Sequence, residues 1–237
     1  MAPRVSRSVP ATVARAAAAA GGQLAGVVLG AFGRLRRGKP LHPRGTVHEA
    51  LLTVWGVERP WQVPLLDEAG EHRGVVRVSR AAGLPPPLPD VRGLALRLEE
   101  PTGPVDLLLS TTGVGPLTRY VLLPRLTERC PMTTLLPVRT PTGPLLLRLT
   151  PVASGPATRT WLLAAARASG PWEPAGRLVT TTRPVHPDPD PPLRFDPVRH
   201  LPAGVSQYPC VRLARDPSYV RSRQWSPPSR WRRRRGA

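Results

Sequence analysis

The stretch "VRVSRAAGLPPPLPDVRGLALRLEEPTGPVDLLLSTTG", residues 76–113, predicts most of the fold class. It contains three short apolar runs that are separated by Gly, Pro and Asp. Successive side chains of a strand point to opposite faces, so Arg77 and Ser79 share one face while Val76 and Val78 share the other. The prolines of 85–90 predict a stiff connection outside any strand ladder.

Runs of the same kind recur along the chain, and a strand-like run also follows Gly45. They lie at 72–80, 91–100, 105–113, 117–124 and 144–150. The 33 prolines disfavour long helices, and we expect one helix in the second half, at 160–170, ended by Gly170. The predicted fold class is α+β and mainly β, an antiparallel β-barrel or sandwich with a few peripheral helices.

Composition divides the chain into three parts. Residues 1–40 are rich in Ala and Arg and predict a helical arm, residues 41–223 predict the β domain, and residues 224–237 predict a disordered basic tail. The apolar run at 16–33 contains Gln23 and is short for a membrane span. No signal-peptide cleavage site precedes "RLRRGKP". A weak contact of the arm or tail with an anionic membrane stays open.

The net charge of +19 is carried almost entirely by arginine, since Lys39 is the only lysine. This composition can reflect genomic base content, so we predict no specific nucleic-acid partner from it, although such a charge favours salt-dependent contact with anionic surfaces. Cys130 and Cys210 are too few for a disulfide framework or a zinc site. Free thiols in a reducing, cytoplasmic compartment are the expectation.

An ordered series of short motifs runs along residues 41–223. They are "HPRG" from His42, "VRVS" at 76–79, "DVRGLALRL" at 90–98, "DL" at 106–107, "FDP" at 195–197, "LPAGV" at 201–205 and "ARDPSY" at 214–219. In this order the chain resembles the haem catalase superfamily, especially its short, peroxidase-like members. The resemblance implies a catalase-like antiparallel β-barrel that binds haem b and its iron.

The resemblance also implies roles for five residues. Tyr219 would be the axial iron ligand, and Arg215, four residues earlier, would favour its phenolate. His42 would move protons between the two oxygens of a peroxide, because imidazole titrates near neutral pH. Ser79 would orient His42, and Arg77 would pair with a haem propionate. The implied partners are a peroxide and a small organic electron donor, and an oligomer is possible.

The chain departs from the family at two points. It contains no asparagine, whereas catalases carry one just after the "DL" strand, and Val78 stands where the family has phenylalanine. The missing asparagine favours a peroxidase-like reaction over dismutation of hydrogen peroxide, and Val78 leaves fewer aromatic rings around a haem. Two alternatives stay open: a non-catalytic catalase-fold binding protein with weak or no haem, and a basic protein that associates with surfaces. His48, His72, His186 and His200 are expected to be solvated.

Overall fold

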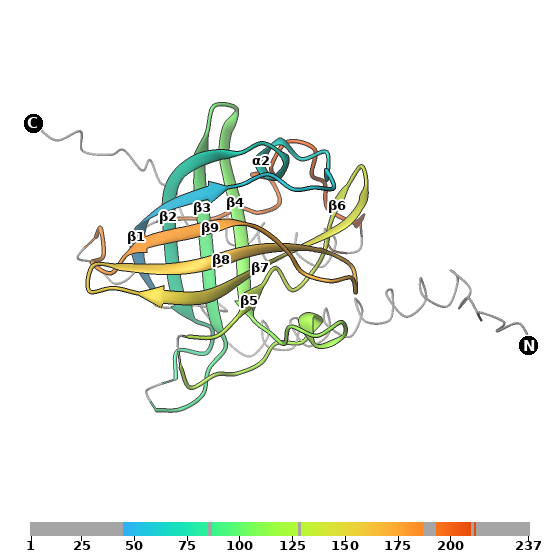
Figure 1. The fold of residues 1–237 in the computed structure, drawn as a ribbon. Coiled ribbons are helices and arrows are strands. Elements are labelled where there is room, and N and C mark those ends of the chain that lie inside the picture. The colour runs from blue at the N-terminus through green and yellow to red at the C-terminus, as the bar shows by residue number, and fades with distance from the viewer. Residues whose placement is uncertain (1–44, 85–86, 128, 187–192, 210, 212–237) are drawn as a thin grey trace, which may run out of the picture.

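A computed structural model describes residues 45–84, 87–127, 129–186, 193–209 and 211. The first four strands follow one another as antiparallel neighbours (Figure 1). They are β1 (Gly45–Val54), β2 (Gly70–Arg80), β3 (Arg92–Glu100) and β4 (Gly103–Thr111). The remaining strands are β5 (Met132–Thr133), β6 (Val138–Thr140), β7 (Gly143–Ser154), β8 (Thr158–Arg167) and β9 (Glu173–Thr181).

The strands form one closed barrel. The sheet order is β5-β4-β3-β2-β1-β9-β8-β7-β6, and the short β5 also pairs with β7. This second pairing closes a ring of eight strands and leaves β6 as an addition at the edge of β7. Closure removes the exposed strand edges that an open sheet would present. The predicted mainly-β antiparallel barrel is confirmed.

The core fills the barrel from the inward faces of its strands. On β2 and β3 it includes Val76, Leu94, Leu96 and Leu98, which are almost inaccessible, and Val78 packs against them. The alternation predicted for residues 76–79 and 94–98 is therefore correct. Arg77 and Ser79 lie on the outer face of β2 because they have the opposite parity.

One end of the barrel is plugged. The short helix α2 (Pro64–Asp67) follows β1, and its Leu65 and Leu66 join the core together with Trp61. The carboxylate of Asp67 accepts hydrogen bonds from the backbone N–H groups of Trp61 and Val63, both at 2.9 Å. These bonds hold the Trp61 loop over the barrel end, as the position of α2 in Figure 1 indicates.

Two elements differ from the sequence prediction. Residues 160–170 were expected to form a helix, but 158–167 form β8, whose Ala164, Ala165 and Ala166 are buried on both faces. A strand buried on both sides reads as a continuous apolar run, which periodicity does not separate from a helix. Residues 117–124 were expected to form a strand but contain the 3-10 helix η1 (Thr118–Tyr120), with Leu117 81% exposed.

The predicted arm at 1–40 and tail at 224–237 lie outside the described residues. Among the described residues, no helix has the length and apolar character needed to cross a bilayer.

Candidate functional site

The outer face of β2 carries two of the five predicted site residues. Arg77 is half-buried and Ser79 is 8% exposed. The register places Ala95 of β3 beside Arg77 and Gly93 beside Ser79. In β4, Leu108 lies next to Ala95 and Ser110 next to Gly93. We call these six residues the outer platform: a surface of small and apolar side chains with one guanidinium and two hydroxyl groups.

Gly45 completes this platform from β1. It is paired directly with Ser79. A Cβ at position 45 would lie 2.7 Å from the Val78 carbonyl oxygen, 2.9 Å from Cζ of Arg77 and 3.0 Å from Cβ of Ser79. These separations are too short for any residue but glycine, so the missing side chain at 45 leaves the space that Arg77 and Ser79 occupy. Gly45 is also the glycine of "HPRG", three residues after His42.

The other predicted site residues, His42, Arg215 and Tyr219, lie outside the described residues. Their roles therefore stay predictions from the sequence. Within the described ranges, no group of three or more His, Cys, Asp or Glu side chains is placed to hold a metal ion.

A second polar centre surrounds Asp106 of β4, which lies on the outer side of the barrel because it has the opposite parity to the core residues Val105 and Leu109. Its carboxylate is 1% exposed and accepts two bonds from Arg97, from Nε at 2.7 Å and from Nη2 at 2.6 Å. Nδ1 of His200 donates at 2.7 Å, and the backbone N–H of Asp196 donates at 2.6 Å. Four donors thus converge on one buried carboxylate, which we call the Asp106 network.

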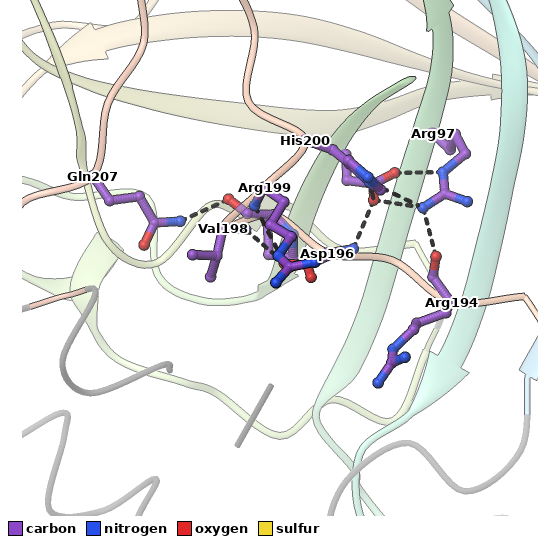
Figure 2. A network of polar contacts seen from close by, with 9 residues as sticks. Arg97, Arg194, Asp196, Val198, Arg199, His200 and Gln207 are labelled. Atoms are coloured by element: carbon purple, nitrogen blue, oxygen red, sulfur yellow. Dashed lines mark hydrogen bonds and ion pairs between the residues drawn. The ribbon is translucent and has the colours of Figure 1, made fainter. Parts of the chain in front are cut away.

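The Asp106 network attaches the segment 193–200 to the barrel wall. The backbone N–H of Asp106 donates to the carbonyl of His200 at 2.8 Å. Arg97 donates to the carbonyl of Arg194, and its guanidinium lies 5.2 Å from the centre of the Phe195 ring. Figure 2 shows Arg97 and His200 side by side, with Arg194 next to them. The "DL" and "FDP" motifs, about ninety residues apart, therefore meet in the fold.

Asp196 makes the segment itself compact. Its carboxylate accepts the backbone N–H groups of Val198 and Arg199, at 3.2 Å and 3.3 Å, while its carbonyl accepts the N–H of His200 at 2.9 Å. The side chain of Asp196 is only 5% exposed. An aspartate that binds the backbone two and three residues ahead is typical of a tight turn.

The "DL" and "FDP" motifs stand out in the sequence, but their meeting in the Asp106 network was not predicted from it. His200 was expected to be solvated, and instead its ring is one of the donors to Asp106. His48 is 4% exposed, and its Nε2 forms a 2.9 Å hydrogen bond with the Thr46 hydroxyl. Nδ1 of His72 lies 2.7 Å from a carboxylate oxygen of Glu100. The sequence did contain a signal for this network. The chain has 15 Asp and Glu residues against 34 Lys and Arg residues, so a carboxylate in an apolar strand such as "VDLLL" is expected to pair with a basic side chain.

Comparison with known proteins identifies the architecture. No sequence family and no curated protein matches the chain. Among solved structures, a fungal catalase matches with a TM-score of 0.59 at 13% identity, covering 84% of this chain and 61% of the catalase. The fold is catalase-like.

Two further structures agree. A bacterial catalase gives a TM-score of 0.55 at 12% identity, covering 78% of this chain and 56% of its own. Catalase A from Saccharomyces cerevisiae gives 0.59 at 10% identity, covering 78% and 60%. The catalase-like chain thus spans about three fifths of the length of these enzymes. At such identities the likeness extends to the barrel and leaves the activity to be established.

Proposed function

We propose that the protein is a haem-dependent, peroxidase-like oxidoreductase that acts on hydrogen peroxide or organic hydroperoxides. The main support for the proposal is the outer platform on a catalase-like barrel. There Arg77 and Ser79 lie next to Gly45, whose missing side chain leaves room for both. The motif that contains Gly45 begins with His42, so the sequence links the predicted acid–base residue to this end of the platform.

The residues of the outer platform fit a porphyrin. A haem offers a flat apolar ring with two carboxylates at one edge. Gly93 and Ala95 of β3 and Leu108 of β4 present small or apolar groups, and a flat ring can approach such a surface closely. Arg77 is half-buried on the same face, and a guanidinium can form paired hydrogen bonds with a carboxylate. In the proposal, Arg77 holds a propionate.

The chemistry of the site is divided between the cofactor and the chain. When bound, haem would supply a redox-active iron that can donate electrons to the peroxide. His42 takes a proton from one peroxide oxygen and returns it to the other, which makes the departing oxygen a better leaving group. Ser79 orients the imidazole through its hydroxyl. Tyr219 would hold the iron as phenolate, a form that the positive charge of Arg215 would favour.

The Asp106 network supports this arrangement from a distance. It holds 193–200 against the barrel, and the sequence continues from there to Arg215 and Tyr219. A segment that carries a metal ligand needs a defined point of departure from the fold, because a ligand must be placed within a fraction of an ångström. We infer that Asp106 supplies that point.

Peroxidase chemistry is preferred over dismutation because of the side chains at the end of β4. The chain has no asparagine, and residues 110–112 are Ser, Thr and Thr. The hydroxyls of Thr111 and Thr112 already donate to carbonyl oxygens, of Leu123 at 2.8 Å and of Gly113 at 2.8 Å. They are engaged in holding the loop after β4, so they are poor substitutes for an amide that orients a second peroxide.

Absorbance spectroscopy tests the proposal. Protein produced with ample haem should show a Soret band that Tyr219→Phe abolishes. Arg77→Leu should weaken haem binding about tenfold, since a hydrogen bond to a charged group contributes about 1.5 kcal/mol or more. His42→Ala should keep the band and lose peroxide-dependent oxidation of a phenolic donor. The exposed Arg177→Gln is the matched control and should change neither.

The non-catalytic alternative makes the opposite prediction. Only two phenylalanines occur in the chain, Phe32 and Phe195, so few aromatic rings are present to enclose a porphyrin. On that reading the purified protein shows no Soret band after haem reconstitution, and Arg77→Leu has no spectroscopic effect.

The assignment of His42 has its own test. Turnover of peroxide by His42→Ala at the parent rate would overturn the assignment of the acid–base residue.

A further inference from the structure

A cavity of about 300 Å³ opens at the barrel end away from α2. Its lining comes from β2, β3, β5, β7 and β8 and from the loops that join them at that end. The lining residues on these elements are Val78, Arg92, Leu94, Arg129, Met132, Pro151, Ser154, Gly155, Arg159, Thr160, Trp161 and Thr182. This volume is at the lower end of the range of small-molecule sites, about 300–1,000 Å³.

The two ends of the barrel differ in how they are filled. At the α2 end Trp61, Leu65 and Leu66 belong to the core, and the hollow beside the two leucines has only about 40 Å³. At the other end no comparable side chain enters from the described residues, and the inward faces of the strands line open space instead. The cavity of about 300 Å³ is therefore confined to one end of the barrel and does not reflect loose packing throughout the core.

The inner part of the cavity is apolar, with one polar atom. Val78, Leu94, Met132 and Trp161 face the barrel interior. Trp161 is 5% exposed, and within the described structure its indole Nε1 has no hydrogen-bond partner. A buried donor without an acceptor is destabilising, so buried indoles usually find a partner. An acceptor inside the cavity would satisfy it.

The mouth of the cavity is basic. Arg129 and Arg159 line it, and the buried Arg92 also belongs to the cavity lining. No Asp or Glu occurs among the described lining residues. The hydroxyl residues there are Ser154, Thr160 and Thr182. Arg129 and Ser154 are exposed, so this side opens to solvent. Guanidinium groups form paired hydrogen bonds with carboxylates and phosphates, which favours an anion at the mouth.

We propose that the barrel-end cavity binds an amphipathic anion, a medium-length aliphatic chain that ends in a carboxylate or phosphate. The chain lies between Val78, Leu94 and Met132, and the head group is held by Arg159 and Arg129. An oxygen of the ligand accepts the indole N–H of Trp161. The proposal does not depend on haem, because Val78 lies on the inner face of β2, whereas Arg77 and Ser79 lie on the outer face.

Calorimetric titration of the full-length protein with decanoate, below its aggregation concentration, tests the proposal. We expect saturable binding of decanoate, at least tenfold weaker binding of the uncharged decanol, and weaker binding of decanoate at high salt. Decyl phosphate is the second arm, and tighter binding than decanoate would identify phosphate as the preferred head group. Absence of binding by both anions, or equal affinity for decanol, would overturn the proposal.

Variants locate the site. Arg159→Gln should weaken decanoate binding about tenfold, while the exposed Arg177→Gln on β9 should leave the affinity unchanged. In a proton–nitrogen correlation spectrum, decanoate should shift the indole signal of Trp161, which Trp161→Phe identifies by its loss. Parent affinity in Arg159→Gln, or an indole signal that stays in place at saturation, would show that the anion binds elsewhere. Haem content, read from the Soret band, should be unchanged by decanoate, so the two proposals fail separately.

Discussion

Arg97 and Arg119 are both largely removed from solvent, yet the protein stabilises their charges in different ways. Arg97 has a carboxylate partner, and its side chain forms two bonds with Asp106. Arg119 is 2% exposed and donates to the carbonyls of Gly115 at 3.1 Å and Ala168 at 2.8 Å. Its guanidinium lies 4.5 Å from the ring centre of Trp172. No ion pair to Arg119 occurs among the described residues.

The region around Trp172 holds a second cation. Arg148 of β7 lies 4.7 Å from the centre of the same ring. Burial lowers the pKa of Arg119, and the nearby Tyr120 opposes that shift. Burial also lowers the pKa of Arg148, and the positive charge of Arg119 lowers it further. Arginine side chains stay charged in proteins, so one indole and a few carbonyls stabilise two like charges here.

The contrast reflects the supply of acid in the chain. With 34 basic and 15 acidic residues, most arginines have no carboxylate to meet. The protein places Asp106 where a distant segment must be attached, whereas around Trp172 it uses an aromatic ring and backbone carbonyls. Arg167 follows the second pattern, with a hydrogen bond to the carbonyl of Thr142 and a contact of 4.5 Å with the Trp61 ring. We therefore expect loss of the carboxylate to cost more than loss of an indole.

The largest effect is expected for Asp106→Asn. The substitution leaves the buried Arg97 without its counter-ion, and breaking a buried pair typically costs about 3–5 kcal/mol. Urea unfolding followed by circular dichroism measures the change in free energy of unfolding. The exposed Glu58→Gln is the control and should change that free energy by less than about 0.5 kcal/mol. A loss below about 1 kcal/mol for Asp106→Asn would remove the contrast between the two regions.

The second effect concerns Trp172→Leu, which should lower the free energy of unfolding by about 2 kcal/mol. It removes two cation–ring contacts, each of about 0.5–2 kcal/mol, and the hydrogen bond from Nε1 to the Val114 carbonyl. Trp172→Phe keeps a ring and should recover roughly half of the loss. Trp55→Leu, at a side chain 51% exposed, is the control for loss of an indole. Equal stability of Trp172→Leu and the parent would mean that the carbonyls suffice.

A smaller, pH-dependent effect is expected at Asp90. Burial raises the pKa of this carboxyl, but hydrogen bonds from the backbone of Ala82 and Leu84 and from Arg80 outweigh it, so the pKa lies below its usual 3.8. A lowered pKa in the folded state stabilises the protein above pH 3.8, and this contribution is lost as pH falls through the folded-state pKa. Asp90→Asn should therefore be less stable by about 1 kcal/mol at pH 7. The difference should shrink as pH falls below 3.8 and be lost once pH is below the folded-state pKa, and a difference that stays constant with pH would contradict the assignment.

The smallest effect is expected for His200→Gln. The His200 side chain is 32% exposed, and Asp106 keeps its bonds to Arg97 and to the backbone N–H of Asp196 when the ring is removed. We expect a loss of about 0.5 kcal/mol, typical of a partly solvated pair. Chemical denaturation at pH 7 measures it. A loss as large as that of Asp106→Asn would place the main anchor at the histidine and not at Arg97.

Much of the barrel could be predicted from local pattern. Val76 and Val78 alternate with Arg77 and Ser79 because β2 is covered differently on its two sides, and that difference is written in successive residues. β8 could not be predicted in this way, since Ala164, Ala165 and Ala166 are buried on both faces. At 117–124 alternation was misleading, because Leu117 and Val121 are exposed and none of the described strands pairs with them.

The sequence by itself determined the strands with one inner and one outer face, the proline-rich connections, and the order of motifs that predicted a catalase-like barrel. Only the tertiary structure decided which distant residues meet. Asp106 accepts a hydrogen bond from His200, and Gly45 leaves space for the Arg77 side chain. Trp161 lines a cavity formed by strands from both halves of the chain. The physical reason is that face and turn preferences act between neighbours in sequence, whereas charge pairing, close approach and cavities depend on strand register around the closed barrel.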